Sequence, residues 1–303
     1  MNEAPTFRSG YVVVVGRPNV GKSTLINALV GAKAAIVSNK PQTTRNSIRA
    51  VLNDPRGQMV FIDTPGLHRP LHGLGRFMER QAASSLEMAD AVCFLVEARD
   101  RRIGKADEII LDILKSVTVP VVLVVNKIDE PCPPDLSDGW NCYAERKKFI
   151  HTVMVSALEG RNLDLLLDIL FSIMPPGPPI FEDDRLVDCT ERFLAAEVIR
   201  EQVFRQTEQE VPHSVAVLVE EFKSPEEYPE RRSLLVRATI FVERSGQKAI
   251  LIGKGGARLK SIGEVARKEL EEVFGYNVYL DLWVKVRPGW RNSEKELRRM
   301  GYT

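Results

Sequence analysis

The sequence predicts an α/β domain with a mostly parallel sheet and helices on both of its faces, followed by a smaller α+β domain. Three observations predict this fold class. Short apolar runs alternate with helical stretches over the first half of the chain, a proline cluster then interrupts the pattern, and a helix-strand-strand-helix-helix-strand order follows it. A chain of 303 residues is long enough for two domains that each bury a core.

The first domain begins with an apolar, β-branched run, Tyr11–Val15, which ends at a glycine and precedes a helical pattern. Such a run is typical of a strand that is buried on both faces. Similar runs are separated by helical stretches, for example over 105–115 and 163–173. Because this alternation builds parallel sheets, we expect strands whose carboxyl ends share one edge; the runs are 11–15, 59–62, 91–96, 119–125 and 152–155.

A proline cluster marks the domain boundary. Its residues can neither continue a helix nor join a central strand, so we expect a short, stiff linker; they are Pro175, Pro176, Gly177, Pro178 and Pro179. The predicted divisions are 1–174 for the first domain, 175–189 for the linker and 190–303 for the second domain with its C-terminal tail. Within the second domain we expect a helix over 190–206, strands over 214–222 and 233–242, a helix-glycine-helix segment over 247–274, and a last strand over 277–286.

The composition excludes several classes of protein. Apolar residues make up 44% of the chain and charged residues 27%, which excludes a fibrous or wholly disordered chain. The 42 basic and 41 acidic residues give a net charge of +1 and so no general attraction to nucleic acid or membrane. The charge is uneven, however, because residues 181–230 carry a net −9 and residues 246–268 a net +5. We therefore expect a basic face on the second domain.

The cysteines and the apolar segments indicate the compartment. The four cysteines include no C-x-x-C pair, which argues against a zinc cage or a disulfide framework and suits a reducing cytosol. The N-terminal segment lacks the apolar core of a signal peptide, and no run of eighteen apolar residues occurs. We expect a soluble protein that is neither secreted nor membrane-spanning.

A phosphate-loop pattern, G-x-x-x-x-G-K-[ST], follows the first predicted strand. Its glycines let backbone N–H groups turn inward around phosphates, and the next helix presents its N-terminus to the same anion. We expect Lys22 to reach the β- and γ-phosphates and Ser23 to offer its hydroxyl to Mg²⁺. The nucleotide-binding residues predicted here are Gly16, Arg17, Pro18, Asn19, Val20, Gly21, Lys22, Ser23 and Thr24.

Three further segments follow predicted strands at the same sheet edge. Asp63 is placed to hold Mg²⁺ through water, and Gly66 to offer its N–H to the γ-phosphate. The carboxylate of Asp129 can accept two hydrogen bonds from guanine, whereas adenine presents no such pair of donors. The Ser156-Ala157 pair offers a backbone N–H to the guanine carbonyl oxygen. These segments add Asp63, Thr64, Pro65, Gly66, Leu67, Asn126, Lys127, Ile128, Asp129, Ser156 and Ala157 to the predicted site.

These four motifs, in this order, resemble those of translation-factor-type GTPases. The resemblance implies GTP and GDP as ligands, Mg²⁺ as cofactor, and slow hydrolysis of GTP to GDP and phosphate. Such families place a Mg²⁺-binding threonine in a mobile switch, and the matching segment is 41–45, with Thr44 preferred and Thr43 as the alternative. The implied metal ligands are Ser23, Thr44 and Asp63, and the implied catalytic residues are Lys22, Thr44 and Gly66.

One position departs from the pattern of Ras-like enzymes. Leu67 stands where those enzymes have the glutamine that orients the attacking water. The water is then positioned either by backbone and metal or by another residue, such as His68. Members with the loop sequence G-x-P-N-x-G-K-S use the asparagine, here Asn19, to bind K⁺; a turn-stabilising role is the alternative. No arginine finger is identifiable, because Arg17 is free to face solvent and Arg45 lies in the switch.

The helix-glycine-helix segment contains Gly253-Lys254-Gly255-Gly256. Two glycines flanking this turn let the backbone approach a nucleic-acid chain while Lys254 meets phosphate, as in the G-x-x-G loop of KH domains, which hold about four single-stranded nucleotides. The surrounding element order resembles a type II KH domain. The predicted RNA-binding residues are Gly253, Lys254, Gly255, Gly256, Arg258 and Lys260. Two tryptophans follow later in the chain. The alternation of side chains along the segment 282–290 predicts that Trp283 lies in the core and that Trp290 is exposed.

The combination of these two domains resembles the Era family of bacterial ribosome-assembly GTPases over almost the whole chain. The segments QTTR, DTPGLH, IGKGGARLKSIG and LWVKVRPGW carry the resemblance. It implies binding to the 3′ end of 16S ribosomal RNA and a role in assembly of the small ribosomal subunit. It also implies a monomer in the cytoplasm with peripheral association to the inner membrane.

Two other functions compete with this interpretation. An RNA chaperone with a non-hydrolytic nucleotide site is disfavoured by the intact Lys22, Ser23, Asp63 and Asp129. A tRNA-modification GTPase shares the loop asparagine, but that family ends in a catalytic cysteine motif, whereas this chain ends in Arg-Met-Gly-Tyr-Thr.

Overall fold

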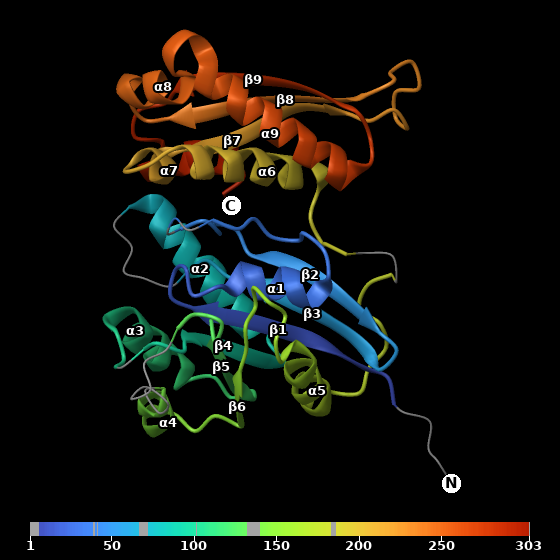
Figure 1. Cartoon of the computed structure of the whole chain (residues 1–303), viewed down its shortest axis with the longest axis vertical. Helices are drawn as coiled ribbons and strands as arrows, with labels where there is room; N and C mark the ends of the chain where they lie inside the picture. The colour runs from blue at the N-terminus through green and yellow to red at the C-terminus, as the bar shows by residue number, and fades with distance from the viewer. Residues whose placement is uncertain are drawn as a thin grey trace. The chain divides into compact units, whose positions relative to one another are not determined.

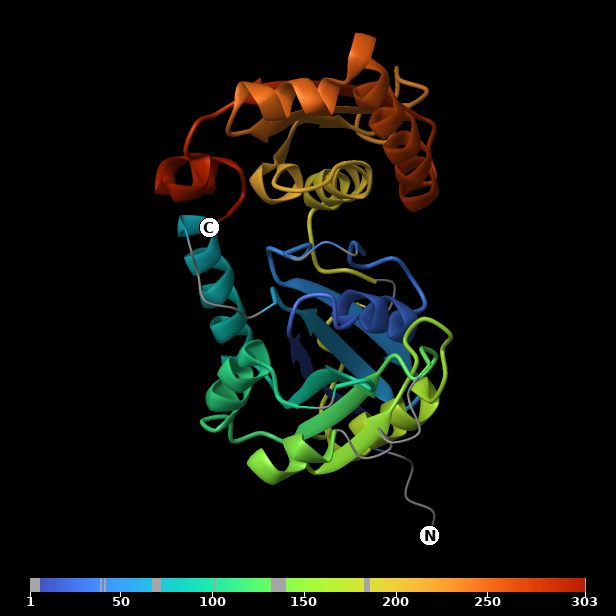
Figure 2. The same ribbon diagram turned by 60° about the vertical axis from the view of Figure 1, so that its left-hand side comes forward.

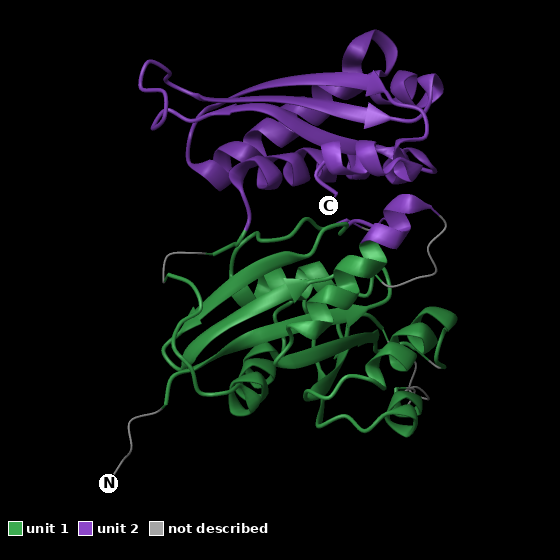
Figure 3. Ribbon diagram, turned by 180° about the vertical axis from the view of Figure 1, so that it is seen from behind, with its two compact units in different colours: residues 1–37, 44–69, 78–188 green, residues 38–43, 70–77, 189–303 purple. Residues whose placement is uncertain are grey.

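The computed structural model describes residues 6–38, 40, 42–66, 72–100, 102–131, 140–182 and 186–302. The chain divides into two compact units: residues 1–37, 44–69 and 78–188 form the first, and residues 38–43, 70–77 and 189–303 form the second. Figure 3 shows the two units in different colours. No helix among the described residues is long and apolar enough to cross a membrane.

The first unit is built on a sheet with the strand order β2-β3-β1-β4-β5-β6. All neighbours are parallel except β2 and β3, which are antiparallel. The five expected strands are present, and the edge strand β2 is an addition that the sequence pattern did not reveal. The bounds are β1 (Arg8–Gly16), β2 (Ile48–Asp54), β3 (Gly57–Asp63), β4 (Ala91–Glu97), β5 (Val121–Asn126) and β6 (His151–Met154).

Helices cover both faces of this sheet (Figures 1 and 2). Alternate residues of β1 point to opposite faces, so Val12 and Val14 pack with α1 and α5, whereas Val13 and Val15 pack with α2, α3 and α4. Both faces of the strand are therefore buried, as its continuous apolar run predicts. The helices are α1 (Lys22–Val30), α2 (Gly73–Glu87), α3 (Lys105–Leu114), α4 (Asn141–Arg146) and α5 (Leu163–Ile173).

The segment expected to be a linker packs along the first unit instead. Gly177 donates its backbone N–H to Phe7 O at 3.1 Å, and the carbonyl of Pro175 accepts the N–H of Ser9. Further on, Asp188 donates its N–H to Arg49 O on β2 at 2.9 Å. Prolines lack an N–H, but their carbonyls still accept hydrogen bonds, so a proline-rich segment can pair along a sheet edge.

The second unit has a sheet of the order β7-β8-β9, with β7 and β8 antiparallel and β8 and β9 parallel. Apolar residues of α6, α8 and α9 pack against the same sheet in one core. The α-β-β-α-α-β order agrees with the expectation, and α7 and α10 are additions. The bounds are α6 (Glu191–Gln206), α7 (Val211–Ser214), β7 (Ala216–Lys223), β8 (Leu234–Val242), α8 (Ser245–Ile252), η2 (Lys254–Gly256), α9 (Ala257–Phe274), β9 (Val278–Val286), η3 (Trp290–Asn292) and α10 (Glu294–Arg299).

The predicted placement of the two tryptophans is wrong for both. Trp283 is 56% exposed, because the adjacent Val284 takes the inward position on β9 and neighbouring residues of a strand point to opposite faces. Trp290 is 0% exposed: its ring stacks on Tyr302 at a centroid distance of 5.9 Å, and its Nε1–H donates to Ser214 O at 2.9 Å. The C-terminal turn, and not the strand, therefore supplies the buried indole.

Candidate functional site

The phosphate loop lies between the end of β1 and the first turn of α1, where all nine residues predicted for it are found. Asn19 and Gly21 have positive φ values of 65° and 102°, so the backbone reverses within a few residues. A Cβ at Gly21 would lie 2.3 Å from Asn126 Nδ2, and this close approach requires glycine. The loop thus faces the carboxyl end of β5, at the sheet edge where open α/β folds bind ligands.

Lys22 lies inside the loop. Its Nζ donates to the backbone oxygens of Gly16 at 3.0 Å and Arg17 at 3.2 Å, and the side chain is buried. Burial lowers the pKa of Lys22 to about 8, against the raising effect of the Asp63 carboxylate. The ammonium is therefore held on carbonyl oxygens at the position from which it can meet phosphate oxygens.

The three predicted metal ligands converge on one point. Ser23 Oγ donates to Asp63 Oδ2 at 2.6 Å, Thr44 Oγ1 donates to the same oxygen at 2.9 Å, and the two hydroxyls are 3.1 Å apart. Thr43 instead donates to Lys40 O at 2.7 Å, so Thr44 is the threonine that lies in this cluster. Two hydroxyls and a carboxylate form an all-oxygen donor set of the kind that Mg²⁺ prefers, so these residues fit that cation.

The segment after β3 lies next to the phosphate loop. Thr64 Oγ1 donates to Val14 O of β1 at 2.7 Å, which ties the start of this segment to the strand below the loop. Gly66 lies against Pro18, because a Cβ at Gly66 would be 2.9 Å from the proline ring. Pro65 lies between these two residues, while Leu67 and His68 are outside the described residues.

Asn126 joins the base-binding loops to the phosphate loop. Its Nδ2 donates to Val20 O at 2.9 Å, and its Oδ1 accepts the backbone N–H of Ala157 at 3.0 Å. The Asp129 carboxylate accepts a hydrogen bond from the hydroxyl of Ser156. Ile128 donates its N–H to Val155 O at 3.3 Å, so both loops are fixed to neighbouring strand ends. The structure therefore brings all the residues predicted for the base pocket together.

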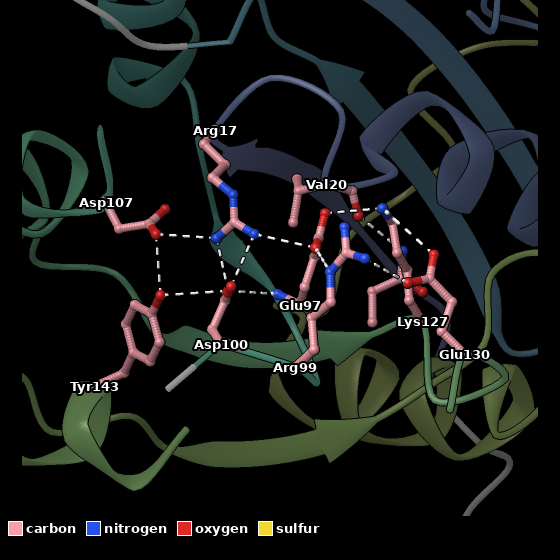
Figure 4. A network of polar contacts seen from close by, with 10 residues as sticks. Arg17, Val20, Glu97, Arg99, Asp100, Asp107, Lys127, Glu130 and Tyr143 are labelled. Atoms are coloured by element: carbon pink, nitrogen blue, oxygen red, sulfur yellow. Dashed lines mark hydrogen bonds and ion pairs between the residues drawn. The ribbon is translucent and has the colours of Figure 1, made fainter. Parts of the chain in front are cut away.

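Three carboxylates hold Arg17, whose side chain is 22% exposed. Its guanidinium contacts Asp100 Oδ2 at 2.6 Å, Asp107 Oδ2 at 3.1 Å and Glu97 Oε2 at 3.2 Å (Figure 4). Burial acts to lower the pKa of Arg17, but the hydrogen bond and charge of Asp100, with the other two carboxylates, raise it above its ordinary value. The guanidinium is fully charged and directed toward the end of β4.

These three carboxylates lie next to the nucleotide site, and the sequence analysis did not identify them. Glu97 ends β4, and Asp100 follows it in the next turn, so both belong to the same sheet edge as the four motifs. A signal was present, because the apolar run 91–96 is followed directly by charged residues. Asp107, on α3, had no such signal, since only the fold brings that helix beside the phosphate loop.

The predicted RNA-binding residues lie in the turn between α8 and α9 and in the first turn of α9. Gly253, Gly255 and Gly256 have φ values of 70°, 60° and 82°, a region that favours glycine. The backbone of this turn therefore reverses sharply. The side chains of Lys254, Arg258 and Lys260 are exposed, and Arg258 also donates to Ile250 O at 2.8 Å, which caps the end of α8.

Both halves of the chain match known families. A family model described as "50S ribosome-binding GTPase" matches residues 11–127, and a KH domain model matches residues 210–291. Among solved structures, a variant of Era from Aquifex aeolicus bound to GDP and AlF4⁻ is 40% identical with a TM-score of 0.91, and the match covers 98% of this chain and 100% of that chain. A structure of Era with MgGDPNP and nucleotides 1506–1542 of 16S ribosomal RNA has the same identity and TM-score, covering 98% and 99% of the two chains.

A curated relative matches along its whole length. GTPase Era of Carboxydothermus hydrogenoformans is 47% identical over 298 residues, which covers 98% of this chain and 99% of the relative. This coverage includes the phosphate loop, the base pocket and the glycine-rich turn together. The expectation drawn from the motifs is thereby confirmed: the chain belongs to the Era family of GTPases.

Proposed function

We propose that this GTPase binds the single-stranded 3′ end of 16S ribosomal RNA through the turn between α8 and α9, and that it acts in assembly of the small ribosomal subunit. One observation carries the proposal: the solved Era that holds MgGDPNP and 16S ribosomal RNA shares its whole two-domain architecture with this chain, at a TM-score of 0.91. The chaperone and tRNA-modification alternatives are superseded by the full-length match to GTPase Era.

In the nucleotide site, each group has a role that follows from its position. The Asp129 carboxylate, held by Ser156, accepts hydrogen bonds from guanine, and the N–H groups of the phosphate loop surround the phosphates. Lys22 exchanges its two carbonyl partners for phosphate oxygens. Ser23, Thr44 and Asp63 hold Mg²⁺, which when bound neutralises charge that develops on the phosphates.

Hydrolysis also requires positive charge near the γ-phosphate. Arg17 is not available for this role, because three carboxylates hold its guanidinium away from the loop interior. We infer that the Asn19 side-chain oxygen helps to hold K⁺ beside the phosphates. GTP turnover is then faster in K⁺ than in Na⁺ at equal ionic strength, and Asn19→Ala removes the difference. Equal rates of the wild type in the two salts contradict this role.

In the proposed RNA site, the backbone of the glycine-rich turn is left uncovered by side chains. The three positive-φ glycines remove side chains from the turn, and the exposed Lys254, Arg258 and Lys260 supply positive charge in it and just after it. Such a surface holds a single strand by its phosphates while the bases are recognised beside the turn. The family model for the first unit mentions the 50S subunit, whereas 16S ribosomal RNA belongs to the small subunit.

The test separates these two ribosomal targets. The full chain, loaded with a non-hydrolysable GTP analogue, is mixed with purified small or large subunits and pelleted. We expect binding to the small subunit and competition by an oligonucleotide of the 16S 3′ end. Binding to the large subunit alone, or no competition by the oligonucleotide, contradicts the proposal.

We also propose that the protein is a cytoplasmic monomer with peripheral association to the inner membrane. This proposal rests on the family membership. Light scattering during size-exclusion chromatography measures the mass of the particle, and fractionation of cell lysate, with a high-salt wash of the membranes, measures the association. A stable dimer, or a protein absent from the washed-off fraction, contradicts the corresponding part.

A further inference from the structure

The end of β4 lies between the two halves of the nucleotide site. In the sheet, β4 lies between β1 and β5, with Leu95 opposite Gly16 and Glu97 opposite Asn126. The phosphate loop leaves β1 on one side, and the loop that carries Asp129 leaves β5 on the other. The side chain of Glu97 is therefore placed between them (Figure 4).

Glu97 contacts one cation from each loop. Its Oε1 accepts a hydrogen bond from Lys127 Nζ at 2.7 Å, and its Oε2 lies 3.2 Å from Arg17 Nη2. Arg99 also donates to Oε2, at 2.7 Å, and the Glu97 residue is only 5% exposed. Burial acts to raise the pKa of Glu97, but hydrogen bonds from Lys127 and Arg99 and the charge of Arg17 hold it below its ordinary value. The carboxylate is thus ionised at neutral pH.

Arg17 is fixed from its other side as well. Asp100 accepts two hydrogen bonds from the guanidinium, at 2.6 Å and 2.9 Å, and its own Oδ2 accepts the backbone N–H of Glu97 at 3.0 Å. Asp107 accepts a further bond from Arg17 and one from the hydroxyl of Tyr143 at 2.9 Å. Bidentate and charge-assisted bonds of this kind fix geometry strongly. The phosphate loop is therefore anchored to β4 through one side chain.

We propose that Glu97 is a positioning residue that fixes the base-binding loop relative to the phosphate loop, through Lys127 and Arg17, and thereby raises the affinity for guanine nucleotides. The inference rests on the nucleotide site proposed above. Glu97 touches neither the guanine-binding carboxylate nor the metal ligands in the contacts described. Because Glu97 acts on the relative placement of two loops that serve every guanine nucleotide, we expect it to contribute uniformly to binding and not to the chemical step.

The test uses Glu97→Gln in the full chain, with fluorescent N-methylanthraniloyl GDP and the corresponding non-hydrolysable triphosphate as probes. We expect the Kd for both to rise by about 10- to 100-fold, since an ionised and buried hydrogen-bond partner of two partly buried cations is lost. The KM for GTP should rise with it, while kcat stays within about twofold. A Kd within about twofold of the wild type, or a fall in kcat at unchanged KM, overturns the inference.

Glu130→Gln is the matched control. Glu130 also contacts Lys127, at 3.8 Å, and Arg99, at 3.2 Å, but its side chain is 38% exposed. We expect the Kd of this variant for the two nucleotide probes to change by less than about twofold, because exposed ion pairs contribute little free energy. An equal effect of both variants indicates a general loss of negative charge and contradicts a specific role for Glu97.

A second measurement separates positioning from simple loss of stability. If Glu97 acts through Lys127, the effect of Glu97→Gln on Kd shrinks at least about threefold in a Lys127→Ala background. If Glu97→Gln only weakens the fold, the effects of the two substitutions on Kd multiply, and the inference fails.

Should Glu97→Gln not fold, Glu97→Asp keeps the charge but withdraws it by one methylene, and the same loss of affinity is expected. A wild type that binds no guanine nucleotide refutes the proposed site itself, whereas normal binding with a silent Glu97 variant refutes only this inference.

Discussion

Replacing Gly21 with alanine tests whether the phosphate loop and the base pocket are as tightly joined as the structure indicates. Gly21 has φ 102°, and an added methyl group would lie 2.3 Å from Asn126 Nδ2. Asn126 is 2% exposed and held by two hydrogen bonds, so it has no room to yield without breaking them. The methyl group must therefore displace the side chain that connects the two halves of the site.

The expected cost of this replacement has two parts. A non-glycine residue in the left-handed region costs about 1–2 kcal/mol. Loss of the two Asn126 hydrogen bonds costs about 0.5–1.5 kcal/mol each, which gives a total of about 2–5 kcal/mol in the free energy of unfolding. Gly31→Ala is the matched control, because Gly31 has φ 71° but no described atom beyond its own residue and its two chain neighbours lies within 4 Å of the position of its Cβ. That control should lose only the first part, about 1–2 kcal/mol.

The assay is urea unfolding of the full chain followed by circular dichroism, with and without GDP. GDP binds only the folded first unit and therefore stabilises that unit. The unfolding transition that GDP shifts to a higher urea concentration is thus the transition of the first unit. We expect Gly21→Ala to lower this transition more than Gly31→Ala does and to abolish its response to GDP. Equal midpoints for the two variants, each still shifted by GDP, would refute the close contact.

The remaining predictions concern the base, the RNA turn and the C-terminal tail. Asp129→Asn should weaken GTP binding by about 1–3 kcal/mol per lost hydrogen bond and strengthen binding of xanthosine triphosphate; a wild type that binds ATP as well as GTP contradicts the assignment. Gly255→Asp places a negative charge on an exposed turn, so affinity for the 16S 3′ oligonucleotide should fall by about tenfold or more with GTP binding intact, and unchanged RNA affinity would indicate another surface. Trp290→Ala should destabilise the second unit by about 3–5 kcal/mol, whereas Trp283→Ala should change its stability by less than about 0.5 kcal/mol; similar unfolding curves would be evidence against the buried indole.

Much of the nucleotide site was predictable because its signals are local. A glycine-rich loop between a buried strand and a helix has few conformations open to it, and the carboxyl ends of parallel strands meet at one edge whatever their order. The convergence of Ser23, Thr44 and Asp63 follows from this rule for two of the three residues. Thr44 is the exception, since the choice between it and Thr43 depended on how the switch backbone turns.

The errors arose where one pattern fits two environments. An alternating strand such as β9 shows two faces, and apolar content alone does not decide which face the helices cover; Trp283 was misplaced for this reason. Trp290 was misplaced because it lies beyond β9, in η3, where the strand alternation no longer applies. The proline-rich segment reads as a linker from its own composition, but the bond from Gly177 to Phe7 O shows that a partner edge was available.

By itself, the sequence determined the two-domain α/β and α+β architecture, the nucleotide motifs and the glycine-rich turn, because each depends on residues close together in the chain. Only the tertiary structure decided that Arg17 is anchored to Asp100 and Asp107 and that Glu97 lies between Arg17 and Lys127. These partners come from separate strands and helices, up to 90 residues apart for Arg17 and Asp107. Long charged side chains take their partners from whatever the fold brings within reach, and no local pattern encodes that choice.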